Sequence, residues 1–148
     1  MAMTEKQAAA KEWLNRNFCK HEELQALYMK LDDMRAGSVK AVAAPAEGEK
    51  VQTQPNPKSG ENYILSIVTF EEMIKQKERQ LHLSDLETAR TIDKLSSAAE
   101  RAVLIYRYLC YLHWPEIARK MAYSERRCHE LHDDALAHIA ELINYTVT

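Results

Sequence analysis

The chain has 148 residues and a formal net charge of −2 at pH 7, which allows one domain, or a small domain joined to an extended helical element, but excludes two full-sized domains. The near-neutral charge argues against tight, sequence-blind binding to nucleic acid, because such binding depends on an excess of Lys and Arg that neutralises phosphates. Ala, Lys, Glu and aliphatic residues are abundant and β-branched runs are scarce, so the composition predicts an all-α fold.

The three cysteines, Cys19, Cys110 and Cys128, lie far apart and form no C-x-x-C pair. This spacing indicates neither a disulfide framework nor a structural zinc site, and it fits a reducing compartment. The sequence has no export signal at its start and no apolar run of about 18 residues. We therefore expect a cytoplasmic protein that needs no metal or cofactor and does not bind a membrane.

The first predicted element is an amphipathic helix within residues 1–35. Apolar side chains from Trp13 to Met34 recur mostly at three- and four-residue steps, which places them on one stripe of a helix. Thr4 can cap the start of this helix. Residues 36–62 then contain all three glycines and three of the four prolines, a composition that predicts a flexible linker.

A second amphipathic helix is predicted over residues 63–96. Its apolar residues, which include Ile67, Phe70 and Ile74, lie near heptad spacing with charged residues between them. A helix of about 33 residues would be about 50 Å long and cannot bury its apolar stripe on itself. We therefore expect a coiled-coil-like antiparallel hairpin with the first helix, in a homodimer or a higher homo-oligomer.

Residues 97–148 are predicted to form a bundle that contains a helix-turn-helix. Ser97 and Glu100 match the S-x-x-E capping box and start a core helix over 98–112. A short second helix follows, with Pro115 in its first turn. Ser124 stands at the N-cap position of a third helix. The predicted buried face of that third helix comprises Cys128, Leu131, Ala135, Ile139 and Leu142.

Four short motifs follow one another along this segment: an R-x-V-L-x-x-R-Y opening from Arg101, a W-x-E-I-A second helix from Trp114, a Y-S turn at Tyr123, and an L-H-x-x-A-L close from Leu131. In these motifs the segment resembles region 4 of bacterial sigma factors, in the version found in phage and prophage proteins related to late regulators of the RinA and ArpU type. A weaker likeness lies upstream, in the A-K-E-W-L stretch that begins at Ala10.

The resemblance implies a transcription regulator in a bacterial host, which binds double-stranded DNA with the helix after Ser124 in the major groove and contacts RNA polymerase as a further partner. In such a motif the first turn of the recognition helix reads base edges, and flanking residues hold phosphates. Arginine can bind guanine in bidentate fashion, and Glu can accept from cytosine N4. The expected DNA-binding residues are Arg119, Lys120, Ser124, Arg126, Arg127, His129 and Glu130.

Three positions depart from the family pattern: His113 replaces the usual Ser or Thr cap, Ala122 replaces the turn glycine, and Cys128 replaces an aliphatic residue. In addition, Asp133 and Asp134 join Glu130 on the predicted outward face of the third helix, where carboxylates would repel phosphates.

Two other functions are compatible with the sequence. One is a phage packaging protein of the small-terminase kind, which uses the same motif in a ring-shaped oligomer. The other is a protein-binding adaptor that keeps the fold without binding DNA. An enzyme is not expected, because every glycine lies in the predicted linker and no nucleophile comes with a catalytic motif.

Overall fold

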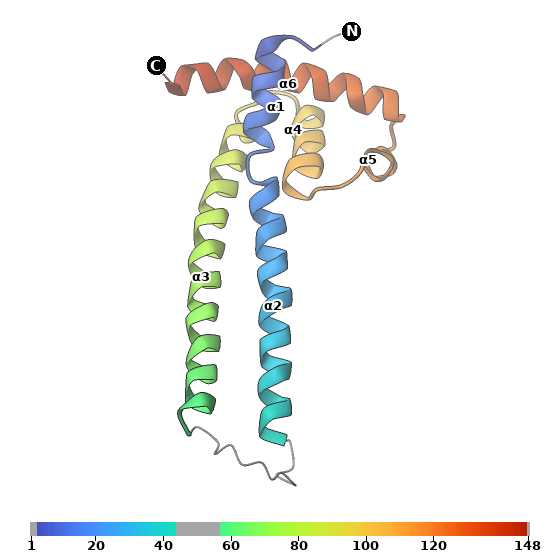
Figure 1. Cartoon of the computed structure of the whole chain (residues 1–148). Helices are drawn as coiled ribbons and strands as arrows, with labels where there is room; N and C mark the ends of the chain where they lie inside the picture. Colours follow the sequence, from blue (N-terminus) through green and yellow to red (C-terminus); the bar gives the residue numbers. More distant parts are fainter. Residues whose placement is uncertain (1–2, 44–56, 148) are drawn as a thin grey trace. The chain divides into compact units, whose positions relative to one another are not determined.

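A computed structural model describes residues 3–43 and 57–147, and these residues form helices and short connections without any strand. The all-α prediction is therefore confirmed. The elements are α1 (Glu5–Leu14), α2 (Phe18–Ala43), α3 (Pro57–Asp93), α4 (Ala98–Leu104), the π-helix η1 (Ile105–Leu109), α5 (Trp114–Met121) and α6 (Glu125–Val147) (Figure 1). Within the described residues, no helix combines the length and the apolar character that crossing a membrane requires.

The chain divides into two compact units, one formed by Lys20–Gln80 and the other by Met1–Cys19 with Leu81–Thr148. In the first unit, α2 and α3 run side by side in opposite directions (Figure 1). Leu24 and Leu31 of α2 are buried, as are Ile67 and Ile74 of α3. The predicted apolar stripes therefore do supply the buried side chains of this hairpin.

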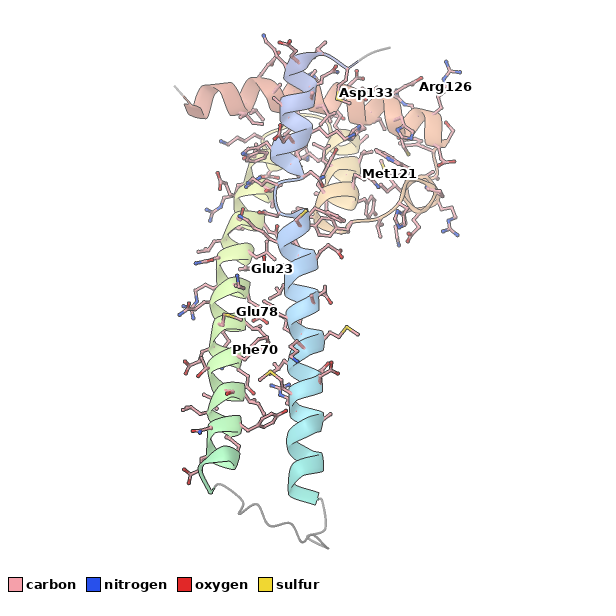
Figure 2. The ribbon with its side chains drawn as sticks, viewed as in Figure 1. Glu23, Phe70, Glu78, Met121, Arg126 and Asp133 are labelled. Atoms are coloured by element: carbon pink, nitrogen blue, oxygen red, sulfur yellow. The ribbon has the colours of Figure 1, made fainter. Side chains whose placement is uncertain are left out.

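Polar contacts also join α2 to α3. The ammonium of Lys77 lies 2.7 Å from the Glu23 carboxylate, and Arg35 pairs with Glu71 at 3.0 Å. The Tyr28 hydroxyl donates a hydrogen bond to the carboxylate of Glu78. Both glutamates, Glu23 and Glu78, are labelled in Figure 2.

The predicted linker over 36–62 is wrong at both ends, because α2 continues to Ala43 and α3 already begins at Pro57; its middle, 44–56, lies outside the described residues. Gly37 is helical, and a Cβ on it would lie 2.6 Å from the Tyr63 hydroxyl. That hydroxyl donates to the carbonyl oxygen of Met34 at 2.7 Å. Gly37 thus permits a close approach between two helices and does not end a helix.

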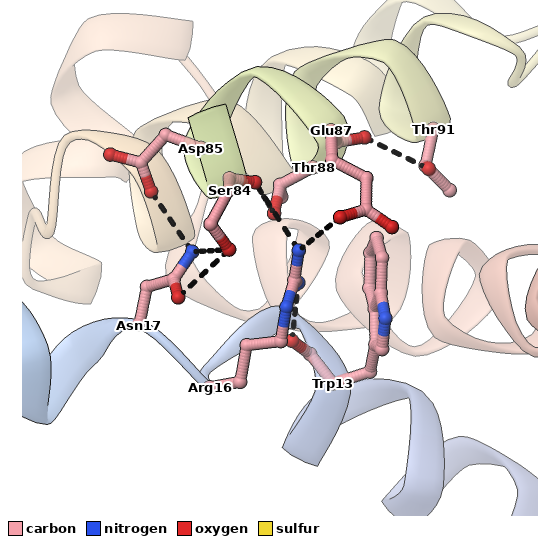
Figure 3. A network of polar contacts seen from close by, with 8 residues as sticks. All are labelled: Trp13, Arg16, Asn17, Ser84, Asp85, Glu87, Thr88 and Thr91. Carbon is pink, nitrogen blue, oxygen red and sulfur yellow. Dashed lines mark hydrogen bonds and ion pairs between the residues drawn. The ribbon is translucent and has the colours of Figure 1, made fainter. Parts of the chain in front are cut away.

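The N-terminal segment is two helices, and the prediction of a single helix is wrong. Its start is as expected, since the Thr4 hydroxyl accepts from the backbone N–H of Gln7. However, α1 ends at Leu14 and α2 begins at Phe18. Between them, the guanidinium of Arg16 donates to the carbonyl oxygen of Ser84 at 3.2 Å. The buried Asn17 amide donates to the Ser84 hydroxyl at 2.8 Å (Figure 3).

The second unit is built around an apolar core. Helix α1 crosses α6 (Figure 1), and the side chain of Gln7 donates to the carbonyl oxygen of Asp133 at 2.9 Å. Core side chains come from α1, α4, α6, η1 and the end of α3. The buried members include Leu14, Ile92, Leu104, Tyr108, Leu136 and Ile139.

The helix predicted over 98–112 is shorter and less regular than expected. Ser97 does cap it, with its hydroxyl 3.3 Å from the N–H of Glu100. The Glu100 carboxylate, however, is buried and lies 2.9 Å from Nδ1 of His138. The α-helix ends at Leu104, continues as a π-helix to Leu109, and is followed by Tyr111 in a left-handed conformation with φ 57°.

Candidate nucleic-acid interface

Helices α5 and α6 are joined by a three-residue turn. Ala122 adopts a left-handed conformation with φ 59°, and its N–H is bonded to the carbonyl oxygens of Ala118 and Arg119. A left-handed residue after the last helical residue is a common way to end a helix, and it usually falls to glycine. Pro115 lies in the first turn of α5 as predicted, whereas the His113 side chain makes no capping bond.

The inward face of α6 anchors this element. Cys128, Leu131, Ala135 and Ile139 are buried, which confirms the predicted buried face apart from Leu142, which is only partly buried. Cys128 packs with Ile117 and Ala118 of α5 in a small apolar cluster. His132, Leu136 and Ala140 are buried as well, so the buried stripe of α6 is wider than the sequence predicted.

The first turn of α6 presents two arginines to solvent. The Ser124 hydroxyl accepts from the N–H of Arg127 at 3.0 Å, so Ser124 is the N-cap as predicted. The Arg126 side chain is 91% exposed and projects from the tip of the helix (Figure 2); that of Arg127 is 52% exposed. Both lie about 3.5 Å from the Glu130 carboxylate. Exposed ion pairs of this kind contribute little and open readily.

Further cations lie on the preceding helix. Arg119 and Lys120 are exposed in the last turn of α5. Together with the backbone N–H groups in the first turn of α6, where the helix dipole is positive, they can provide phosphate contacts. The nearby carboxylates of Glu116 and Glu125 keep the local charge close to balance.

His129 packs against an aromatic residue. Its ring centroid lies 4.1 Å from that of Trp114, and the Arg107 guanidinium lies 5.0 Å from the same indole. The imidazole remains exposed. His129 therefore packs on Trp114 while part of the residue stays open to solvent.

The acidic part of the outward face of α6 lies beside α1. Met3, Thr4 and Gln7 line a hollow of about 620 Å³ together with Arg127 and three carboxylates of α6. Those carboxylates belong to Glu130, Asp133 and Asp134. The positive end of the α1 dipole offsets part of their charge. No local sequence pattern predicts this arrangement, because α1 and α6 are more than 100 residues apart along the chain.

A buried polar pair joins η1 to α6, and no sequence pattern predicts it. The Tyr108 hydroxyl lies 2.6 Å from Nε2 of His132, and both side chains are buried. Burial lowers the pKa of His132 to about 4, and the neighbouring Asp133 carboxylate counteracts part of this shift. The imidazole is therefore neutral at pH 7, and it supports α6 without adding charge to the interface.

Comparisons of the chain with protein-family models, with curated proteins and with solved structures gave no match.

Proposed function

We propose that the α5–α6 element binds double-stranded DNA in a sequence-specific way, with the first turn of α6 in the major groove. One observation carries the proposal. Arg126 is 91% exposed on the capped tip of a helix whose opposite face is buried around Cys128 and Leu131. Because its opposite face is packed in this way, the helix can enter a groove with little loss of conformational freedom.

In the proposed complex, Arg126 or Arg127 leaves the Glu130 carboxylate and binds guanine O6 and N7. A good bidentate contact is worth about 1–3 kcal/mol of discrimination between bases, which exceeds the ~0.2–1 kcal/mol of an exposed ion pair. Glu130 is then able to accept from cytosine N4. Because Gln7 holds α1 against α6 at Asp133, the reading surface is confined to the first turns of α6.

Arg119 and Lys120 set the register by holding phosphates, together with the N–H groups that follow Ser124. The near-neutral charge of the whole chain implies moderate affinity for a single copy, and binding of two or more copies to repeated half-sites would raise it. On this proposal, and on the resemblance to sigma region 4, the protein is a phage-type transcription regulator of a bacterial host.

Fluorescence anisotropy with a labelled duplex of mixed sequence, titrated over a series of salt concentrations, tests the phosphate contacts. The Arg119→Gln/Lys120→Gln double variant should reduce the slope of log affinity against log salt by about 2, since each phosphate contact contributes about 0.9. A matched control is Lys75→Gln/Arg79→Gln, which removes the same charges from the exposed side of α3 and should leave the slope unchanged. Absence of duplex binding at low salt would refute the proposal and favour a protein-binding adaptor.

A further inference from the structure

A second, smaller hollow lies in the unit formed by the two ends of the chain. It encloses about 240 Å³ between α1, the first residue of α2 and the segment around η1. Three of its lining side chains are basic, and they belong to Lys11, Arg107 and His113. No carboxylate is among the residues that line it. Lys11 and Arg107 therefore bring two positive charges to the hollow. Burial, and in second place the nearby Asp85 carboxylate, raises the pKa of Tyr111.

The other walls are mostly aromatic. Phe18 and Tyr111 meet edge to face with their ring centroids 5.5 Å apart, and Tyr108 lines the hollow with them. Asn15 adds an amide at the rim. Flat apolar walls with a few polar groups are typical of sites that bind small molecules, and aromatic walls favour an aromatic ligand through stacked or edge contacts.

The backbone around the hollow is irregular over one short segment. The segment that carries Arg107 and Tyr108 is a π-helix, a form that is rare and often found at functional sites. Tyr111 lies two residues after the end of this π-helix. Its φ is 57°, a backbone conformation that residues other than glycine rarely adopt. The N–H of Leu112 is bonded to the carbonyl oxygen of Tyr106 at 2.9 Å, so Tyr111 ends this helix with a left-handed residue, as Ala122 ends α5.

We propose that this hollow binds a small aromatic carboxylate. Its ring would pack against Phe18 and Tyr111, and its carboxylate would be held by Lys11 and Arg107. A guanidinium has five N–H donors, and Arg107 uses one of them on the carbonyl oxygen of Leu112 at 3.0 Å. The volume suits a single ring with a short acidic substituent. None of the residues that line this hollow is among the proposed DNA-binding residues, although the Arg107 guanidinium also lies over the Trp114 ring that contacts His129.

Titration of the 15N-labelled full-length protein with benzoate, followed by NMR, tests the proposal. Benzoate should shift the amide signals of residues 107–113 to saturation. Benzamide, which keeps the ring without the charge, and acetate, which keeps the charge without the ring, should each bind about tenfold more weakly. A lack of saturation with benzoate, or equal affinity for benzamide, would overturn the proposal.

The matched variants lie on one helix. Lys11→Met should weaken benzoate binding about fivefold, because it removes one charge-assisted hydrogen bond, whereas Lys6→Met on the same helix should leave it unchanged. Both lysines are exposed, so neither variant is expected to unfold the protein, and circular dichroism checks this. Equal binding by Lys11→Met and the wild type would show that the hollow does not hold the carboxylate as proposed.

Discussion

The Tyr108 hydroxyl and Nε2 of His132 lie 2.6 Å apart, which joins η1 to α6 inside the second unit. The two rings are stacked with their centroids 5.7 Å apart, and the His132 ring meets Trp114 edge to face at 4.9 Å. Burial raises the pKa of Tyr108 to about 12 and lowers that of His132 to about 4. The pair is therefore neutral over the physiological pH range, and a proton on His132 would weaken it.

Acidification should destabilise the protein through His132. The unfolded imidazole titrates near pH 6.5 and the folded one near pH 4, so the unfolded state takes up the proton first. The contribution of the neutral His132 to the free energy of unfolding is fully present above about pH 6.5. It is lost as the pH falls towards 4, and the total loss is roughly 3 kcal/mol. Urea denaturation at a series of pH values measures it. His132→Gln should flatten this part of the profile, whereas the control His82→Gln, at an exposed position, should retain it.

Removal of the Tyr108 hydroxyl tests the same pair at constant pH. Tyr108→Phe keeps the ring but leaves Nε2 of the buried His132 without its partner. We expect the free energy of unfolding at pH 7 to fall by about 1–3 kcal/mol, the cost of an unsatisfied buried polar group. A loss below about 0.5 kcal/mol, the range of neutral surface substitutions, would show that the hydrogen bond contributes nothing.

The break between α1 and α2 depends on Asn17, whose amide is bonded to the hydroxyl of Ser84 at 2.8 Å and to the carboxylate of Asp85 at 3.2 Å. Asn17→Ala should lower the free energy of unfolding by about 1–3 kcal/mol, because these bonds are buried or partly buried. Thermal and urea denaturation report the change. Asn62→Ala, an exposed asparagine of α3, serves as the control, and an equal effect of the two substitutions would contradict the assignment.

The turn residue Ala122 gives a prediction of opposite sign. The left-handed conformation of an alanine lowers the stability of the folded state by roughly 1–2 kcal/mol. Glycine avoids this cost, but it lowers the free energy of unfolding by about 0.4–1 kcal/mol because it gives the unfolded chain more conformational freedom. Ala122→Gly should therefore stabilise the protein by about 0.5–1 kcal/mol. Ala137→Gly, in the exposed interior of α6, should destabilise it by about 1 kcal/mol. Denaturation curves showing a loss of stability for Ala122→Gly would count against a strained turn.

Features determined within a few residues were predictable from the sequence. Thr4, Ser97 and Ser124 each cap a helix as expected, because a capping hydroxyl acts on an N–H three residues away. The buried stripe of α6 followed from helical periodicity. The same local rules made Glu100 the partner of Ser97 in a capping box, yet its carboxylate pairs with His138, 38 residues further along.

Features determined by distant contacts were missed. The apolar spacing from Leu14 to Phe18 is compatible with one continuous helix, and the break between them is held by Ser84, 67 residues beyond Asn17. A glycine at position 37 predicts a break in the helix, whereas the close approach of the Tyr63 side chain explains its presence. The π-helical η1 and the left-handed Tyr111 have no sequence pattern that single-chain reasoning can detect. The position of α1 beside Asp133 is likewise determined by a contact between residues far apart in the sequence.

The central claim, that the first turn of α6 reads bases, is tested most directly by selecting duplexes with a randomised centre and sequencing those bound. The wild type should enrich a short sequence containing guanine, and the Arg126→Ala/Arg127→Ala variant should lose that enrichment while keeping its helicity. The control Arg79→Ala/Arg90→Ala removes two exposed arginines of α3 and should enrich the wild-type sequence. Enrichment of the same sequence by the Arg126→Ala/Arg127→Ala variant, or no enrichment by the wild type, would contradict the claim.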